Sequence, residues 1–328
     1  MTRTLRLILA ALAALVLTLG VTACGSDDDG GGGGGGGGSE GGSADLIESD
    51  PANEGKSITI GSKNFTEQFI LGEIYGQALE AAGFDVKKDL NLGSEQVAFR
   101  ALTSGQVDAY PEYTGTSLTS FFDVDIADVP KDPDAAYELA KKEYAAKDIT
   151  ALARTEFENT FRLAATTEVQ EGKLEGAKTI SDVAELPKAD DLKVSGFPEC
   201  RQRTDCLVGI NNLYDWKPEF VSTEAKYTPL DEDQADLSFV FSTDGELALD
   251  DYKIIEDDKA LFPPYNVSLG IRNDALKKIG PKGQEVLEAV QEPLTLEAMQ
   301  ELNSRVDLDK QEPEQVAGDY LTELGFTK

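Results

Sequence analysis

Hydrophobic and polar positions along the chain follow two periods, one typical of strands and one typical of helices. Residues 57–60 alternate polar and apolar side chains, which predicts a half-buried strand. In the next segment Ile70 and Ile74 begin an apolar stripe at helical spacing, which predicts an amphipathic helix. Asn64, with Glu67 three residues later, fits a capping box at the start of this helix. The folded region is therefore predicted to begin with a strand and a helix.

The same two patterns alternate over the rest of the chain. Strand-like and helix-like segments succeed one another over about 270 residues, which predicts an α/β architecture and leaves room for two domains. Further strands are expected at 84–86, 107–109, 149–153, 161–165, 192–195, 238–241 and 267–271. Further helices are expected at 94–105, 134–147, 207–214, 285–290, 294–306 and 313–324.

Two polar segments follow predicted strands. NFTEQ at 64–68 comes after the first strand, and YPEYTGT at 110–116 is expected to be the loop that leaves the strand at 107–109. In open α/β sheets, ligands bind at the carboxyl ends of the strands. These two segments are therefore the first candidates for a binding site.

The first 56 residues have the pattern of a secreted and anchored protein rather than of a folded domain. Residues 1–23 combine two early arginines with a short apolar run, which predicts a signal peptide, and the sequence VTAC that ends at Cys24 resembles a lipobox, in which the cysteine is acylated. Residues 24–56 include the glycine run 30–38 and predict a flexible tether. We therefore expect a lipid anchor at Cys24 on the outer face of the cell membrane. An ordinary cleaved signal or an uncleaved anchor is the alternative.

The charge balance is strongly acidic. The chain has 30 Lys and Arg against 61 Asp and Glu, a net charge of −31, and it has no histidine. Such a surface repels nucleic acid, and the lack of histidine excludes histidine-dependent nucleophiles and histidine metal sites. The sequence has no P-loop, GxSxG, CxxC or HExxH motif, so we expect no cofactor, no metal and no catalytic residues. An envelope-anchored hydrolase with paired carboxylates is the alternative, although among 61 acidic residues such a pair readily arises by coincidence.

Two cysteines remain once Cys24 is set aside. Cys200 and Cys206 form an even pair in a chain that is expected to lie outside the cytoplasm, which predicts a disulfide. Because the loop between them is short, its closure is worth on the order of 2 kcal/mol. The bond is therefore expected to pin a loop rather than to hold a domain together.

Aromatic residues beside turn-forming residues are the remaining chemical signal. A quaternary ammonium has no N–H to donate, so proteins recognise it by packing aromatic faces around its methyl groups. Each face contributes roughly 0.5–2 kcal/mol, so four faces supply about 2–8 kcal/mol, and micromolar binding needs about 8 kcal/mol. Taken singly, each of these aromatic residues is more often part of a core. The candidates are Phe65, Tyr110, Tyr113, Phe161, Phe241 and Tyr265.

Five motifs together resemble a known family, the glycine betaine/choline-binding proteins of osmoprotectant ABC importers. They are GSKNFTEQ (61–68), EYTGT (112–116), ENTF (158–161), FSTDG (241–245) and FPPY (262–265), and the similarity runs from about Ile58 to the C-terminus. The resemblance implies a type II periplasmic-binding-protein-like, Venus-flytrap fold, in which two lobes joined by a hinge close on a solute. It also implies a protein that captures a quaternary amine and delivers it to an ABC permease without performing a reaction.

The resemblance divides the chain after the tether. Lobe 1 is expected to comprise residues 57–160 and 261–328, and lobe 2 is expected to comprise residues 161–260. We expect a monomer. Another small solute, or a role as a sensory module with the same fold, is the alternative within this fold.

Site residues are implied by the motifs as well. Gln68 would contact the polar end of the ligand, and Thr116 would donate a hydrogen bond to it. Because a threonine can donate to the carboxylate of a betaine, Thr116 favours betaines over a site for choline alone. Asn64 and Tyr110 are second-rank candidates. The cage around the cation would be formed by Tyr113, Phe161, Phe241 and Tyr265.

Two of these cage residues depart from the family pattern. Relatives commonly have tyrosine where this chain has Phe161 and Phe241. A phenylalanine keeps the aromatic face and lacks the hydroxyl. Binding of a cation is therefore still expected, without a hydroxyl contact from these two positions.

Overall fold

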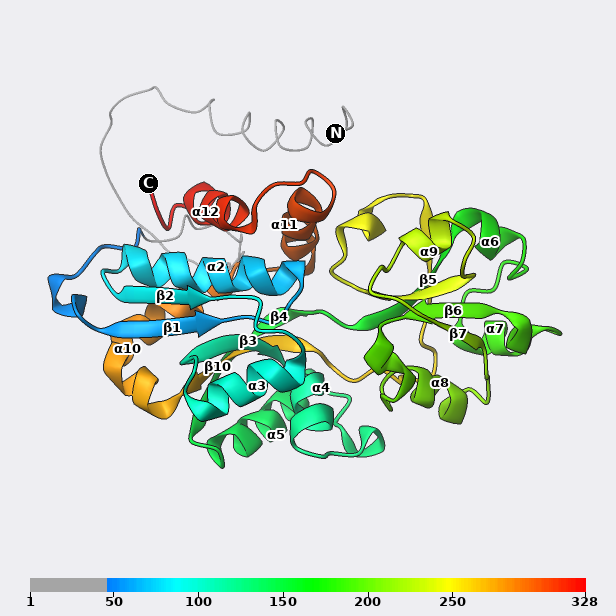
Figure 1. Cartoon of the computed structure of the whole chain (residues 1–328), viewed down its shortest axis with the longest axis horizontal. Helices are drawn as coiled ribbons and strands as arrows, with labels where there is room; N and C mark the ends of the chain where they lie inside the picture. Colours follow the sequence, from blue (N-terminus) through cyan, green and yellow to red (C-terminus); the bar gives the residue numbers. More distant parts are fainter. Residues whose placement is uncertain (1–45) are drawn as a thin grey trace, which may run out of the picture. The chain divides into compact units, whose positions relative to one another are not determined.

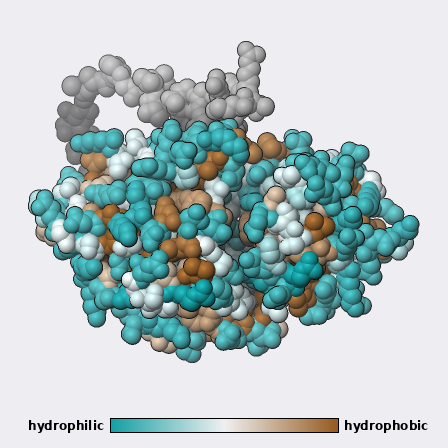
Figure 2. Space-filling model, in the orientation of Figure 1, coloured by the Kyte–Doolittle hydropathy of each residue, from teal (hydrophilic) through white to brown (hydrophobic). Residues whose placement is uncertain are grey.

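The computed structural model describes residues 46–328. The predicted signal peptide, the predicted lipid attachment at Cys24 and most of the predicted tether lie outside these residues. Within residues 46–328 the strands form two sheets of five strands each (Figure 1). No helix in this range is both long and apolar enough to cross a membrane. Hydrophilic residues cover most of the face drawn in Figure 2, as expected for so charged a chain.

The first sheet has the strand order β2-β1-β3-β10-β4. β1 runs parallel to β2 and β3, whereas β10 runs antiparallel to β3 and β4. The strand β10 therefore returns from far along the chain to complete this sheet. The bounds are Ser57–Gly61 (β1), Asp85–Asp89 (β2), Ala109–Tyr113 (β3), Ile149–Glu158 (β4) and Asn266–Arg272 (β10).

The second sheet has the strand order β7-β6-β8-β5-β9. β6 runs parallel to β7 and β8, and β5 runs antiparallel to β8 and β9. All five strands lie within residues 161–255, so the chain crosses between the sheets at 159–160 and again at 256–265. The bounds are Phe161–Thr166 (β5), Lys193–Gly196 (β6), Glu219–Ser222 (β7), Leu237–Phe241 (β8) and Tyr252–Ile255 (β9).

Helices alternate with these strands, as the mixed pattern predicts. The longer helices are α2 (Thr66–Ala81), α3 (Glu95–Ser104), α5 (Pro133–Ala145), α10 (Asn273–Gln291), α11 (Leu296–Asp307) and α12 (Pro313–Glu323). The shorter helices are α4 (Thr114–Thr116), α6 (Thr167–Glu171), α7 (Ile180–Ala184), α8 (Leu207–Leu213) and α9 (Thr228–Asp231). Single helical turns lie at η2 (Pro51–Asn53), η3 (Ser117–Phe121), η4 (Ile126–Asp128), η5 (Ala189–Asp191), η6 (Pro198–Arg201) and η7 (Gly245–Ala248).

The helix α10 is longer than the predicted segment 285–290. It consists of two helical parts that meet at a kink, where Gly280 has a φ of 66° and is followed by Pro281. Glycine and proline inside a helical pattern normally end it. The sequence pattern therefore revealed only the second part.

The helix α2 is buried on nearly all sides. It packs against β2, α10, α11 and α12, and 11 of its 16 residues are buried. Gly72 and Gly76 permit this close packing, since a Cβ atom would lie 2.7 Å from the Leu90 side chain at the first position and 2.9 Å from the Lys88 side chain at the second. The helix whose first turn carries the end of the NFTEQ segment therefore packs closely on β2.

The predicted loop at 110–116 is corrected by the structure. β3 continues to Tyr113, so the first part of this segment is a strand. All five residues of β3 are buried, and a strand covered on both faces does not alternate polar and apolar residues. Beyond Ala109 the strand pairs only with β10, and a proline such as Pro111 is tolerated where one side of a strand lacks a neighbour.

Candidate functional site

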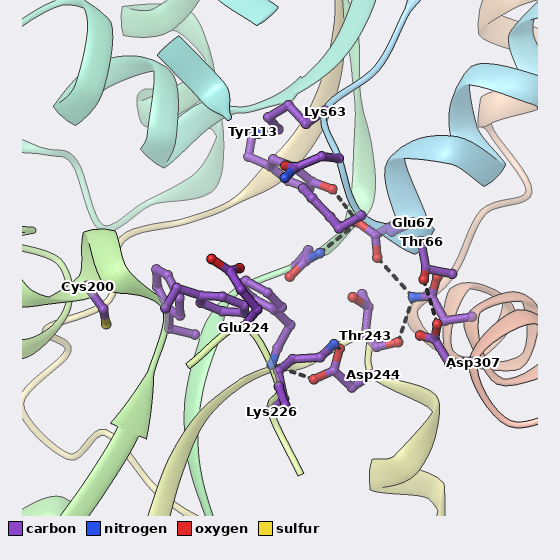
Figure 3. Close-up of a pocket in the computed structure, with 18 of the residues that line it drawn as sticks. Lys63, Thr66, Glu67, Tyr113, Cys200, Glu224, Lys226, Thr243, Asp244 and Asp307 are labelled. Atoms are coloured by element: carbon purple, nitrogen blue, oxygen red, sulfur yellow. Dashed lines mark hydrogen bonds and ion pairs between the residues drawn. The ribbon is translucent and has the colours of Figure 1, made fainter. Parts of the chain in front are cut away.

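A cavity of about 610 Å³ is bounded by segments that are far apart in the sequence (Figure 3). Its wall includes the loop after β1, the end of β3, both crossovers between the sheets and the loop after β8. A cavity of this size is typical of a small-molecule site. The contributing segments lie within 63–69, 94–95, 113–116, 159–161, 197–203, 224–228, 241–246, 265 and 303–310.

Six of the eight residues predicted to contact a ligand lie in this wall. Gln68 and Tyr110 do not. Gln68 is fully buried, and its side-chain oxygen accepts a hydrogen bond from the backbone N–H of Lys63 at 3.1 Å. Tyr110 is fully buried in a separate core cluster and donates its hydroxyl hydrogen to Glu112 at 2.9 Å. The six residues are Asn64, Tyr113, Thr116, Phe161, Phe241 and Tyr265, and their contact with a ligand stays a prediction.

Aromatic rings form a continuous part of the wall. The ring centre of Phe161 lies 5.1 Å from that of Phe241 and 5.8 Å from that of Tyr265. The ring of Phe65 lies 6.1 Å from Tyr113 and 6.2 Å from Phe241, and it is nearly parallel to both. Phe65 therefore connects Tyr113 to the other rings, which makes it a fifth member of the aromatic wall.

Four cationic side chains line the cavity, and three of them are paired with a carboxylate. The pairs are Lys63 with Glu112, Arg203 with Asp205, and Lys226 with Asp244. Each of these three cations also lies over an aromatic ring, at 4.4 Å from the Tyr113 centre for Lys63, 5.5 Å from Phe161 for Arg203 and 5.4 Å from Phe241 for Lys226. The fourth, Lys310, donates to the backbone carbonyl of Asp307. The wall therefore combines aromatic faces with positive charges.

Asp205 holds the hydroxyl of Tyr265. This carboxylate is 1% exposed, accepts two hydrogen bonds from Arg203 at 2.7 and 2.5 Å, and accepts a third from Tyr265. Burial acts to raise the pKa of Asp205, but the charge and hydrogen bonds of Arg203 outweigh it, so the pKa is lowered. Burial and the charge of Asp205 raise the pKa of Tyr265 well above its usual range. Tyr265 therefore remains a protonated donor with a fixed ring.

Glu67 holds the hydroxyl of Tyr113 in a comparable way. The predicted capping box at Asn64 and Glu67 is wrong, because α2 begins at Thr66 after Phe65 and has no side-chain cap. Glu67 points instead into the protein, is 2% exposed, and accepts the Tyr113 hydroxyl at 2.7 Å (Figure 3). Burial raises the pKa of Glu67, although hydrogen bonds from its neighbours oppose this rise.

The cysteine loop forms another part of the wall. The Cα atoms of Cys200 and Cys206 lie 5.2 Å apart, within the range that a disulfide requires, and Cys200 lines the cavity. Arg203 and Asp205 lie between the two cysteines in the sequence. The two cysteines are therefore predicted to pin the loop that supplies Arg203 and Asp205 to the site.

Sequence reasoning missed several residues of the wall. Lys63 and Glu67 lie in the GSKNFTEQ motif, so the signal was present, but neither was predicted to contact a ligand, and Phe65 was named only among the aromatic candidates. Phe197, whose ring centre lies 5.5 Å from that of Phe241, follows a strand without any distinguishing pattern. Residues 46–328 contain no group of three or more Cys, Asp or Glu side chains arranged to hold a metal ion.

Comparison with known proteins gives a consistent result. Residues 56–323 match the family model described as the substrate binding domain of the ABC-type glycine betaine transport system. A glycine-betaine-binding protein of Pseudomonas aeruginosa is 34% identical over 284 residues, which cover 82% of this chain and 88% of the relative. An ergothioneine transport permease/ergothioneine binding protein of Helicobacter pylori is 29% identical over 84% of this chain, which spans 49% of that relative.

Similarity to solved structures agrees with these matches. The crystal structure of a glycine betaine/carnitine/choline ABC transporter superposes with a TM-score of 0.69 and 25% sequence identity, covering 82% of this chain and 99% of the other. The predicted two-lobe periplasmic-binding-protein architecture is thereby confirmed. The chain belongs to the family of substrate-binding domains of ABC-type glycine betaine transport systems.

Proposed function

We propose that the protein captures a quaternary-ammonium compatible solute outside the cytoplasm, such as glycine betaine, a related betaine, carnitine or choline, and delivers it to an ABC permease for osmoprotection. The observation that carries this proposal is the continuous aromatic wall of one cavity, in which Phe65 connects Tyr113 to Phe161, Phe241 and Tyr265. A solute whose cation has no N–H is suited to aromatic faces rather than to carboxylates that need a donor.

The other polar groups of the cavity fit the anionic end of a betaine. Thr116 has a hydroxyl that can donate, and Lys63 and Arg203 supply positive charge in the same wall. A charge-assisted hydrogen bond to a carboxylate is roughly twice as strong as one between neutral groups. A betaine would therefore place its trimethylammonium group among the rings and its carboxylate near one of these donors.

Movement and anchoring complete the proposal. We propose that residues 57–160 with 261–328 and residues 161–260 act as two lobes that close on the solute about the crossovers. Acylation at Cys24 would hold a monomer at the outer face of the membrane, and residues 24–56 would tether it with an r.m.s. reach of about 30 Å. Mass spectrometry of the protein isolated from membranes tests this part, since a lipid-modified N-terminal Cys24 is expected.

Titration calorimetry tests the binding function. The purified folded domain should release or absorb heat with a saturable isotherm and a dissociation constant on the order of micromolar for at least one of glycine betaine, proline betaine, carnitine and choline. Glycine is the matched control, because it keeps the carboxylate and lacks the methyl groups. Equal binding of glycine and glycine betaine, or no binding of any quaternary amine, would contradict the proposal.

A second candidate solute comes from the Helicobacter pylori relative. That protein is named as an ergothioneine transport permease/ergothioneine binding protein, and two rings of the wall in this chain are those of Phe161 and Phe241, which carry no hydroxyl. Ergothioneine in the same calorimetric series distinguishes the two, since a much tighter isotherm for it than for glycine betaine would favour this candidate.

A further inference from the structure

A buried carboxylate at the start of α2 connects three separate segments of the chain. Glu67 accepts a hydrogen bond from the Tyr113 hydroxyl at 2.7 Å and from the Asn159 side-chain amide at 2.8 Å. Its other oxygen accepts from the Asn303 side-chain amide at 3.2 Å. Glu67 thus joins the end of β3, the first crossover between the sheets and the helix α11.

The connection extends into the second sheet. The amide of Asn303 also donates to the backbone carbonyl of Thr243 at 2.9 Å, in the loop that follows β8. Asn159 donates its backbone N–H to the carbonyl of Tyr265 at 3.1 Å, in the second crossover. A single carboxylate therefore lies at the junction of Tyr113, both crossovers and the loop after β8.

A purely structural explanation of this carboxylate is weak. Burying a charged group costs several kcal/mol unless it is well paired, and the donors of Glu67 are neutral hydroxyl and amide groups. A neutral glutamine or an apolar side chain would fill the space at lower cost in desolvation. What a carboxylate adds is the ability to accept from three donors at once through two oxygens, which fixes their mutual orientation.

We propose that Glu67 is a positioning residue for solute binding, which fixes the ring of Tyr113 in the aromatic wall and ties it to the crossover at Asn159. This inference rests on the proposed function, because it requires Tyr113 to contact the solute. Without the bond from Tyr113 to Glu67, the ring of Tyr113 can rotate away from the orientation that completes the wall. Solute binding then has to order this ring, and the conformational entropy lost in ordering it lowers the affinity.

A double-mutant cycle in solute affinity tests the proposal. Glu67→Gln keeps the volume but opposes an amide donor to the amide of Asn303, and Tyr113→Phe keeps the ring and removes the hydroxyl. Each change alone should weaken glycine betaine binding by about tenfold, the usual effect of losing a hydrogen bond to a charged group. The double variant should bind about as weakly as either single variant, because both changes disrupt the group of hydrogen bonds around Glu67 that holds the same ring.

Controls separate positioning from general damage. Glu73→Gln is the matched control, since Glu73 lies on the same helix, is 8% exposed, and pairs with Lys88 outside the cavity wall. It should lower the melting temperature and leave the affinity unchanged. Glu67→Asp keeps the buried charge and shortens its reach, and it replaces Glu67→Gln in the cycle if the glutamine variant does not fold.

The outcomes are distinct. Wild-type affinity in the Glu67 variant, or losses that multiply to about a hundredfold in the double variant, would overturn the inference while the proposed function stands. Failure of the wild-type protein to bind glycine betaine or any other quaternary amine would overturn the proposed function, and the inference with it. A tenfold loss in each single variant with little further loss in the double variant supports the inference.

Discussion

Two tyrosines of the cavity wall are held by carboxylates in contrasting surroundings. Tyr113 donates to Glu67, whose other partners are neutral amides, and burial raises the pKa of that carboxyl group. Tyr265 donates to Asp205, which also pairs with Arg203, and this cation lowers the pKa of the aspartate. The wall therefore contains two similar bonds between a tyrosine and a carboxylate, one beside a cation and one without a cation among its hydrogen-bond partners.

The contrast shows that a ring can be fixed in two ways at different cost. The Asp205 pair obtains charge compensation from Arg203 but depends on a loop between two cysteines to deliver both residues. Glu67 lies on the buried helix α2 and needs no such loop, yet its hydrogen-bond donors are neutral hydroxyl and amide groups. The predicted phenylalanines of the cage, Phe161 and Phe241, have no hydroxyl to fix and are held by ring packing and by cations over their faces.

Removal of the positive charge of Arg203 should have the largest effect on stability. Arg203→Leu leaves the 1% exposed Asp205 with Tyr265 as its remaining side-chain donor, so the free energy of unfolding should fall by about 3 kcal/mol. Binding of glycine betaine should weaken as well. Arg272→Leu is the matched control, because its partner Asp274 is largely exposed and the loss should stay below about 1 kcal/mol. If both variants lost the same free energy of unfolding in urea denaturation, the buried ion pair would contribute no more to stability than the exposed one.

Removal of the cysteine pair should have the next largest effect, and only on one side of the comparison. Cys200→Ala with Cys206→Ala opens the loop that carries Arg203 and Asp205, and the cost should be about 2 kcal/mol of unfolding free energy. The wild-type domain should contain no titratable thiol from this pair under non-reducing conditions. Two free thiols per domain, measured with a thiol reagent in denaturant, would contradict the predicted disulfide.

Loss of the Tyr265 hydroxyl should have a moderate effect. Tyr265→Phe removes one donor from Asp205 while Arg203 remains, so the stability should fall by about 1–2 kcal/mol and glycine betaine affinity by a smaller factor than in Tyr113→Phe. The reason is that Arg203 still holds the aspartate in place. Tyr252→Phe, which removes a hydroxyl bonded to the exposed Asp231, serves as the control. A larger loss of glycine betaine affinity in Tyr265→Phe than in Tyr113→Phe would contradict this prediction.

Adding a hydroxyl at either phenylalanine of the wall should have a small effect on affinity. Phe241→Tyr adds a hydroxyl to a half-buried ring, so it should change affinity by less than about threefold. Phe161→Tyr adds it to a ring that is 6% exposed and should cost about 1 kcal/mol of stability, because a tightly packed site must accommodate another atom. Calorimetry and thermal melts of both variants measure these changes. A large gain in affinity would show that the hydroxyls contribute to recognition.

The smallest effect is a difference in pH dependence between the two carboxylates. The pKa of Glu67 is raised above its ordinary value of 4.5, so the stability of the wild type relative to Glu67→Gln should fall as the pH rises above 4.5. The pKa of Asp205 is lowered below its ordinary value of 3.8, so the advantage of the wild type over Asp205→Asn should be lost as the pH falls below 3.8. Slopes of the same sign for both residues, in urea denaturation at several pH values, would contradict the contrast.

Much of the architecture could be predicted from local patterns. The strand at 161–165 and the strand at 267–271 were each located within one residue of the observed ends, because strong apolar runs lie between turn residues. The predicted strand at 107–109 shares only Ala109 with β3, because the strand from Ala109 to Tyr113 depends on pairing with β10 more than 150 residues later. Long-range pairing leaves little trace in a short stretch of sequence.

The site was predicted less completely than the fold. Tyr113 and Phe161 could be placed by motif, and both lie in the cavity wall. Glu67 was interpreted as a cap, because the spacing of a capping box is a local signal whereas the direction of a buried side chain is set by tertiary packing. Arg203 gave no signal at all, since its position depends on how the loop between the two cysteines folds.

A crystal structure of the domain with glycine betaine would show whether the aromatic wall holds the quaternary ammonium group. We expect the quaternary nitrogen to lie within about 6 Å of the ring centres of Tyr113, Phe161, Phe241 and Tyr265. A ligand whose nitrogen lies outside this wall, with carboxylates as its nearest neighbours, would contradict this expectation.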